Sequence, residues 1–254
     1  MSFKTTVAFV AQVLAIVIGF GGGLAKADEI RVIAANASKD AIGELMAGFE
    51  KASGHKVVAS WGGTDGIERR IGGGEVFDVV IIAAPNIDKL IAQGKLASGS
   101  RTNIARSGVG IAVRSGLPKP DISTAEAVKA AVLQARSVAY SSGPSGHYIV
   151  DLFTRMGIAE QVKGKVRQPP SGSQIAELLA RGEADLGFQQ ISELLHAAGV
   201  DYLGPLPAEI QNVTIYAAGL HAAAPSAEAA RVLVRHLTSP DSAASIRKVG
   251  MEPG

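Results

Sequence analysis

The chain has 254 residues, no cysteine, and 25 Lys and Arg residues against 23 Asp and Glu residues. Without cysteine the protein has no disulfide, no thiolate nucleophile and no thiolate metal site. Lys4 and Lys26 precede Asp28, so the chain from Asp28 onward carries 23 basic and 23 acidic residues. A neutral chain has no whole-molecule field that would attract nucleic acid or an anionic membrane surface, and we expect neither as a partner.

Residues 1–27 have the layout of a signal peptide. Lys4 supplies the positive start, residues 5–24 carry no charge, and the end of the segment, Ala25-Lys26-Ala27, fits the small-x-small cleavage pattern. We therefore expect cleavage before Asp28 and export. The alternative is an uncleaved membrane anchor, since the apolar stretch is long enough to span a bilayer. The later chain has no such run, and without an N-terminal cysteine to carry a lipid it is expected to be a free periplasmic protein.

Strand-like apolar runs alternate with helical segments after Asp28. Apolar residues at helical spacing, closed by Gly54, predict a helix over 39–53. The pattern predicts further helices at 65–71, 86–93, 124–135, 147–156, 226–237 and 239–249. It predicts strands at 30–34, 56–60, 77–82, 107–114, 138–140, 186–188 and 212–220. Such alternation indicates a mainly parallel sheet with helices on both faces.

The elements fall into two α/β units separated by Pro118 and Pro120. The strand at 107–114 leads out of the first unit, and the strand at 212–220 can lead back. Two crossings between two lobes would place a cleft at the hinge. We therefore expect residues 28–110 with 217–254 in one lobe and 111–216 in the other.

Four segments, taken in their order and spacing, carry a resemblance: AANASKDAI at 34–42, SWGGTDGIERRI at 60–71, FDVVIIAAP at 77–85 and RGEADLGF at 181–188. They resemble the periplasmic molybdate-binding protein family and its wider group, the type II solute-binding proteins. The resemblance covers essentially the whole chain after the signal peptide. It implies two α/β lobes, a hinge of two crossing strands, a ligand in the cleft and delivery to an ABC transporter permease. We expect a monomer without a cofactor.

The resemblance also indicates binding positions, and several have diverged. Ala37, between Asn36 and Ser38, stands where the family has a serine that bonds the oxyanion. Gln190 stands where the family has a tyrosine. Two hydroxyl donors are thereby lost, which favours a small organic or carboxylate-bearing anion over a molybdate-like oxyanion.

At three other binding positions of the family, this chain has a small or hydroxyl-bearing residue. Thr64 corresponds to a family serine and keeps its hydroxyl, whereas Ser145 adds a hydroxyl where the family has alanine. Gly172 falls near a family valine contact. Of the hydroxyl donors, one is therefore kept and one is new.

Two glycine-rich loops point to an anion site independently of the resemblance. Residues 62–66 (GGTDG) and 141–146 (SSGPSG) each lie between a strand and a helix. Glycine permits close backbone approach, and a helix start offers free N–H groups and a partial positive charge. Either loop alone is equally a plain turn with a helix cap. The candidate ligand-binding residues are Asn36, Ala37, Ser38, Gly63, Thr64, Asp65, Ser145, Gly146, Gly172 and Gln190.

The alternative to a receptor is an enzyme, because some proteins resembling this group are periplasmic aconitate isomerases. Such chemistry needs a proton acceptor and donor near the bound acid. His147 and Tyr140 are weak candidates, and neither has a partner that the sequence reveals. The five histidines lack metal-ligand spacing, so no metal site is expected. Asp78 in FDVV is expected to form hydrogen bonds at a strand end rather than to act in catalysis.

Overall fold

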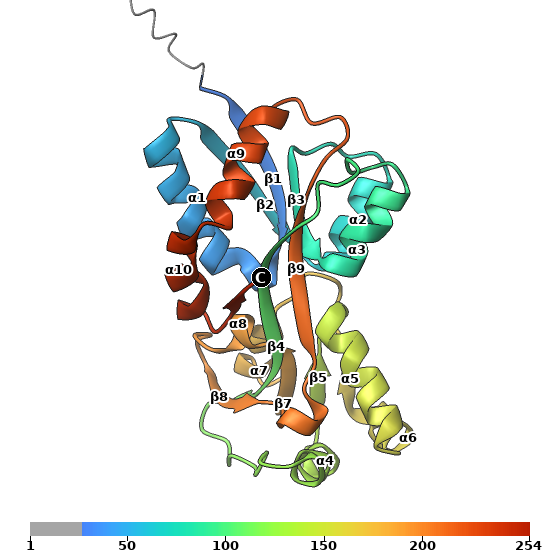
Figure 1. The fold of residues 1–254 in the computed structure, drawn as a ribbon. Helices are drawn as coiled ribbons and strands as arrows, with labels where there is room; N and C mark the ends of the chain where they lie inside the picture. The colour runs from blue at the N-terminus through green and yellow to red at the C-terminus, as the bar shows by residue number, and fades with distance from the viewer. Residues whose placement is uncertain (1–26) are drawn as a thin grey trace, which may run out of the picture.

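The fold is that of a computed structural model, in which residues 27–254 are described. The predicted signal peptide, apart from Ala27, lies outside these described residues. Within residues 27–254 no helix combines the length and the apolar character needed to cross a membrane. Two α/β lobes lie one above the other in Figure 1, joined by the long strands β4 (Thr102–Arg114) and β9 (Val213–Leu220).

The first-lobe sheet has the strand order β2 (Lys56–Gly62), β1 (Glu29–Ala35), β3 (Val79–Ala83), β9, β4. The short β10 (Glu252–Pro253) pairs with β4. Strand β1 runs parallel to β2 and β3, whereas β9 runs antiparallel to both β3 and β4.

The second-lobe sheet contains β6 (Val166–Arg167), β5 (Val138–Tyr140), β7 (Leu186–Gln190), the later part of β4 and β8 (Val200–Pro205). Strand β5 is parallel to β6 and β7, and β4 is antiparallel to β7 and β8. The expectation of a mainly parallel sheet was therefore wrong. Both sheets are mixed, because β9 runs against the parallel strands of the first-lobe sheet and β4 runs against those of the second-lobe sheet.

The chain passes between the lobes along β4 and returns to the first lobe at the start of β9. Strand β4 pairs with β9 as far as Gly108 and with β7 from Val109 onward. Strand β9 pairs with first-lobe strands from Val213 onward. The predicted boundaries, after residues 110 and 216, remain a prediction.

Helices cover the sheets of both lobes (Figure 1). In the first lobe α1 (Lys39–Ser53), α9 (Ala227–Leu237) and α10 (Ala243–Lys248) lie on one side, with α2 (Thr64–Gly72) and α3 (Ala84–Ala92) on the other. The second lobe carries α4 (Ala125–Gln134), α5 (Pro144–Arg155), α6 (Ala159–Val162), α7 (Ile175–Ala180) and α8 (Ile191–Leu194). Short 3-10 turns are η1 (Asn36–Ser38), η2 (Lys163–Lys165), η3 (Ala208–Ile210) and η4 (Pro240–Ser242).

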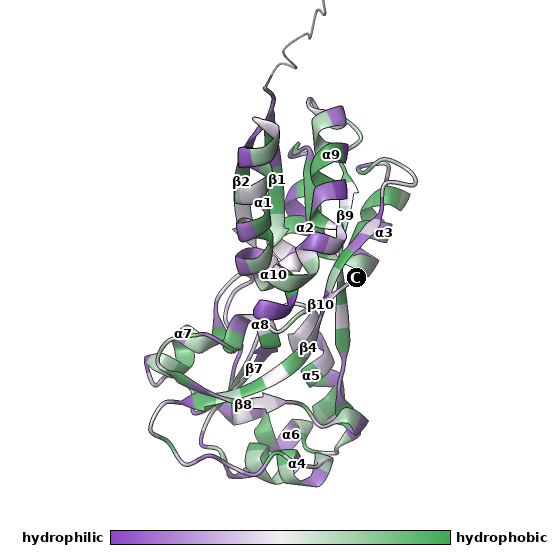
Figure 2. Ribbon diagram, turned by 60° about the vertical axis from the view of Figure 1, so that its left-hand side comes forward, coloured by the Kyte–Doolittle hydropathy of each residue, from purple (hydrophilic) through white to green (hydrophobic). Residues whose placement is uncertain are grey.

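The long helices of the first lobe are set against their sheet by one-sided apolar stripes. On α1 the residues Ile42, Leu45, Met46 and Phe49 are buried at helical spacing, and the left-handed Gly54 ends the helix. Figure 2 shows hydrophobic and hydrophilic residues mixed along α9, whose buried members include Leu233 and Leu237. The first lobe has one continuous hydrophobic core, and the second lobe has two separate clusters.

Asp78 holds the start of β3 to two distant segments. Its side chain is fully buried and accepts hydrogen bonds from the backbone N–H groups of Arg31 and Ser226, both at 2.7 Å. A buried carboxylate is tolerated when such donors replace its water. The expected structural role of Asp78 is confirmed.

Candidate functional site

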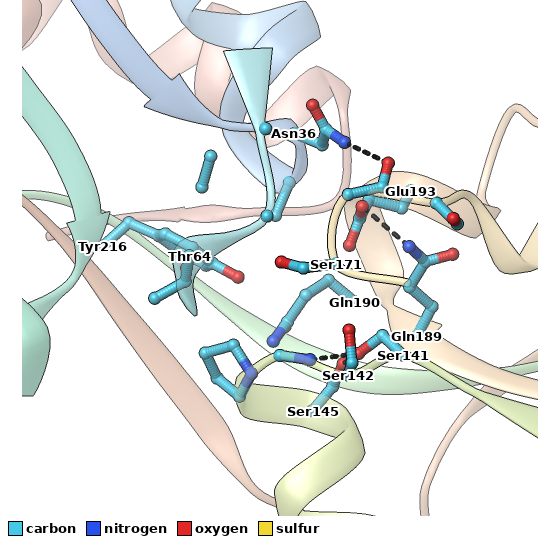
Figure 3. Close-up of a pocket in the computed structure, with 18 residues that line it drawn as sticks. Asn36, Thr64, Ser141, Ser142, Ser145, Ser171, Gln189, Gln190, Glu193 and Tyr216 are labelled. Atoms are coloured by element: carbon cyan, nitrogen blue, oxygen red, sulfur yellow. Dashed lines mark hydrogen bonds between the residues drawn. The ribbon is translucent and has the colours of Figure 1, made fainter. Parts of the chain in front are cut away.

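A cavity of about 40 Å³ lies between the two lobes, where loops following β1, β2, β5 and β7 converge. It is the polar cleft shown in Figure 3. Its lining comes from both sides: Ala35, Asn36, Ala37, Gly62, Gly63 and Thr64 from the first lobe, Tyr216 from β9 at the hinge, and Ser141, Ser142, Gly143, Pro144, Ser145, Ser171, Gly172, Ser173, Gln189, Gln190 and Glu193 from the second lobe.

The first-lobe wall is the start of α2 together with η1. Strand β2 ends at Gly62, Gly63 is the extended residue before the helix, and Thr64 opens it. The first N–H groups of a helix have no partner within the helix, so they are available to a ligand. Thr64 is only 3% exposed and lines the cavity. In the second-lobe part of the lining, the buried Ser142 hydroxyl has no hydrogen-bond partner among residues 27–254, and such a hydroxyl is suited to bind an anion.

The second-lobe wall is the start of α5. Gly143 precedes the helix, Pro144 occupies its first turn, and the hydroxyls of Ser141 and Ser145 lie 3.0 Å apart. Gly146 has no room for a side chain, because an added Cβ would lie 1.5 Å from the carbonyl oxygen of Ser141. This glycine therefore fixes the shape of the loop that presents Ser145.

The lobes touch each other around the cavity. Asn36 Nδ2 donates to the Gly172 carbonyl at 2.9 Å, and the Gly66 N–H donates to Ser171 Oγ at 3.2 Å. An added Cβ on Gly63 would lie 2.4 Å from Ser171 Oγ. The glycine loops thus permit close contact between the lobes as well as close approach of a ligand.

Two further contacts join the lobes near the cavity. The Ser192 hydroxyl donates to the Ala37 carbonyl at 2.7 Å. His147 Nε2 lies 3.1 Å from Asp65 Oδ2. Together with the contacts at Gly172 and Ser171, they describe a closed cleft.

Glu193 and Tyr216 are the titratable side chains that line the cavity, and the lining contains no Lys, Arg or His. Burial raises the pKa of Glu193 to about 8, against the lowering effect of its hydrogen bonds with Gln174, Gln189 and the Gln190 backbone. The residue as a whole is half-buried because part of it faces the cavity, but the surrounding protein removes bulk water from its carboxyl group. The pKa of Tyr216 is raised well above its ordinary value by burial and by the charge of Glu193.

Seven of the ten predicted ligand-binding residues line the cavity: Asn36, Ala37, Gly63, Thr64, Ser145, Gly172 and Gln190. The other three are not part of its lining. Ser38 is buried and its hydroxyl donates to the Ala35 carbonyl at 2.8 Å. Asp65 faces His147, and Gly146 packs against Ser141.

The Gln190 side chain is engaged at the hinge. With the amide oriented to match its neighbours, its oxygen accepts from the Thr214 hydroxyl at 2.9 Å. Its nitrogen donates to the carbonyls of Ser107 and Gly108, both at 3.1 Å. Gln190 therefore ties the end of β7 to β4 and β9, where the chain passes between the lobes.

The two weak catalytic candidates lie away from the cavity lining. Tyr140 is buried in the second-lobe core with its ring 6.1 Å from that of Phe153, and burial raises its pKa. His147 is mostly exposed at the cleft rim beside Asp65. No group of three or more His, Cys, Asp or Glu side chains within residues 27–254 is arranged to hold a metal ion.

Sequence reasoning missed Ser171, Gln189, Glu193 and Tyr216 as cavity residues. The PSGS run that contains Ser171 is a glycine-serine turn before an apolar helical segment, the same signal that marked the other two loops. Glu193 and Tyr216 carry no such signal. They line one cavity because α8 and β9 reach it from different sides (Figure 3).

The fold and the cleft define a two-lobed binding protein. Residues 30–252 match the family described as bacterial extracellular solute-binding protein, and the chain belongs to this family. It is 37% identical over 230 residues to an aconitate isomerase of Pseudomonas sp, covering 88% of this chain and 87% of the relative.

Two molybdate-binding proteins are also similar to this chain. It is 30% identical over 186 residues to the molybdate-binding protein ModA of Azotobacter vinelandii, covering 70% of this chain and 73% of the relative. Among solved structures, an Azotobacter vinelandii periplasmic molybdate-binding protein superposes with a TM-score of 0.76 at 23% identity, covering 89% of this chain and 99% of that chain. The chain is therefore a member of the type II solute-binding proteins of ABC transporters.

Proposed function

We propose that this protein binds a small organic anion with two or more carboxylate groups in the cleft, in the periplasm, and delivers it to an ABC transporter permease. The observation that carries the proposal is the mixed chemistry of the cavity. It offers donors at Thr64 and Ser145 and a carboxyl group at Glu193, without any cationic side chain. A tetrahedral oxyanion needs only hydrogen-bond donors. A polycarboxylate that shares a proton with Glu193 can accept hydrogen bonds from the two hydroxyls and can also bond to the carboxyl group.

The proposed ligand contacts come from both lobes. Thr64 and Ser145 sit at the starts of α2 and α5, where helix N–H groups and the helix dipole favour negative charge. Ala37 offers no hydroxyl, which weakens the case for molybdate. The division into residues 28–110 with 217–254 and 111–216 is part of this proposal, as is export after cleavage before Asp28.

Thermal shift against a panel of anions tests the ligand class. The panel contains molybdate, tungstate, sulfate, cis-aconitate, trans-aconitate and the saturated tricarboxylate tricarballylate. A ligand at 100 times its Kd stabilises the folded protein by about 2.7 kcal/mol, which gives a shift of several degrees. We expect shifts with the tricarboxylates. A large shift with molybdate or tungstate and none with the organic acids would refute the proposal.

A second candidate function is isomerisation of aconitate, favoured by the similarity to the Pseudomonas aconitate isomerase over most of both chains. Moving a double bond by one position requires a group that takes a proton from one carbon and returns it to another. Glu193 and Tyr216 are the titratable side chains in the cavity. Similarity of fold and site does not by itself establish turnover, so the receptor stays the first proposal.

Proton NMR of trans-aconitate incubated with the pure protein separates the two functions. An isomerase produces cis-aconitate until the two isomers reach equilibrium, and in D₂O it can exchange solvent deuterium into the ligand. A receptor leaves both isomers unchanged at stoichiometric protein concentration. The matched control is protein with Glu193→Gln, since this change removes one of the two titratable groups of the cavity and keeps the size of the side chain.

A further inference from the structure

The cavity contains an unusual charge pattern for a site proposed to hold an anion. Glu193 is its acidic side chain, and the lining includes no Lys, Arg or His to balance it. Two negative charges a few ångströms apart repel strongly where water is excluded. A bound carboxylate beside an ionised Glu193 would therefore be unfavourable, and the repulsion disappears when one proton is shared between them.

Two elements packed against α8 hold the Glu193 carboxyl group in place. Gln189, at the end of β7, donates through Nε2 to Glu193 Oε1 at 2.8 Å (Figure 3). The oxygen of the same amide accepts from the Ile175 N–H at 2.8 Å, at the start of α7. Gln189 is 2% exposed, so this chain of hydrogen bonds is rigid and shielded from solvent. The Glu193 carboxyl group is therefore held in a fixed orientation at the wall of the cavity.

We propose that Glu193 holds the ligand as a neutral carboxylic acid, so that closing the cleft over the ligand takes up one proton. The O–H of Glu193 donates a hydrogen bond to a ligand carboxylate, while the Gln189 amide continues to donate to the other oxygen. This inference rests on the proposed function, because it requires a carboxylate ligand in the cleft. The step forms one O–H bond, between the proton and a Glu193 carboxyl oxygen, and no other covalent bond forms or breaks.

Burial supports this assignment by raising the pKa of Glu193 to about 8 in the closed cleft. The elements packed against α8 are β4, β7, β8, α7 and η1. Their titratable residues are Arg106, Arg114, Glu177, Asp201 and Tyr202, and none of these lines the cavity. Tyr216 faces the cavity, but its raised pKa keeps it neutral near pH 7.

The direction of the pH dependence follows from the raised pKa. An open cleft exposes Glu193 to water, where the carboxyl group has its ordinary pKa of about 4.3. At a pH between about 4.3 and about 8, Glu193 is ionised in the open cleft, so ligand binding must add a proton to it. The Kd is therefore expected to rise by as much as tenfold for each pH unit between 6.5 and 8, and about one proton is taken up per ligand at pH 7.

Calorimetric titration with tricarballylate tests the proposal, because this probe has three carboxylates and no double bond to isomerise. Titrations at pH 7 in buffers of different ionisation enthalpy give the number of protons taken up. We expect close to one for the parent and for Glu183→Gln, an exposed control in the same lobe paired with Arg181. We expect none for Glu193→Gln, and a Kd that does not change between pH 6.5 and 8.

A second variant separates Glu193 from the ion pair at the cleft rim. Proton uptake by the His147–Asp65 pair would persist in Glu193→Gln and vanish in His147→Gln, and that result would overturn the assignment. Equal proton uptake by the parent and Glu193→Gln would also overturn it while leaving the proposed ligand class intact. Binding of neither tricarballylate nor trans-aconitate to the parent would overturn the proposed function itself, together with the role of Glu193.

Discussion

Gly63→Ala is expected to weaken ligand binding by blocking closure of the cleft. The added Cβ would lie 2.4 Å from Ser171 Oγ and 2.6 Å from the Gly172 nitrogen, both in the opposite lobe. Contacts below 3.0 Å require one lobe to shift. A shift at this point breaks the hydrogen bonds from Asn36 to Gly172 and from Gly66 to Ser171. Two neutral hydrogen bonds are together worth about 1–3 kcal/mol, which corresponds to a roughly 5- to 150-fold rise in Kd.

Calorimetric titration of the parent and the variant with trans-aconitate measures this effect. The unliganded variant is expected to unfold within about 1 kcal/mol of the parent, because the extended backbone at Gly63 (φ −78°, ψ 145°) is open to alanine. Gly72→Ala is the matched control, since this residue of α2 lies outside the cavity lining and its Cβ would meet nothing within 4 Å. If Gly63→Ala bound as tightly as the parent, contact between these loops would not be part of the ligand-bound state.

Four further predictions address the site, the fold and export. Thr64→Ala and Ser145→Ala should each weaken binding of trans-aconitate by about tenfold to a hundredfold, with near-parental stability, as measured by calorimetry; unchanged affinity in both would refute a ligand between the two helix starts. Asp78→Ala should lower the free energy of unfolding by about 2–4 kcal/mol in urea denaturation, since two N–H groups lose their acceptor. Glu193 should make the parent saturated with tricarballylate lose stability as pH rises from about 4.5 through about 8, because the raised pKa means that the closed, folded state holds the proton in that window; urea denaturation at saturating tricarballylate should show a flatter profile for Glu193→Gln. N-terminal sequencing of exported protein should begin at Asp28, and an intact Met1 would contradict cleavage.

Local patterns in the sequence were sufficient for most of the secondary structure. The helix predicted over 39–53 occurs with those bounds, and the predicted strand 138–140 is β5. Boundaries shifted where tertiary contacts extended an element. Strand β4 begins at Thr102 rather than at residue 107, because β9 supplies a partner for that segment. Helix α5 begins at Pro144 rather than 147, since proline is compatible with the first turn.

The shortest helices and strands have too few residues to show a periodic spacing of apolar residues. The sequence did not predict α6, α7, α8, β6 and β8, which are two to six residues long. Such elements are stabilised by the sheet and by neighbouring helices more than by their own preferences. The strand directions also escaped prediction, because alternation of strands and helices does not reveal which strands connect the lobes.

Like the secondary structure, the site was determined partly by local sequence and partly by tertiary contacts. The sequence alone determined the loops around Gly63 and Ser145, because glycine and hydroxyl residues between a strand and a helix have a local physical meaning. It also determined that no thiol chemistry is available. Only the tertiary structure decided that Ser171 closes against Gly63 and that Glu193 and Tyr216 share one cavity. The pKa of a carboxyl group depends on the water and charges around it, and for Glu193 those surroundings are supplied by segments far apart in the chain.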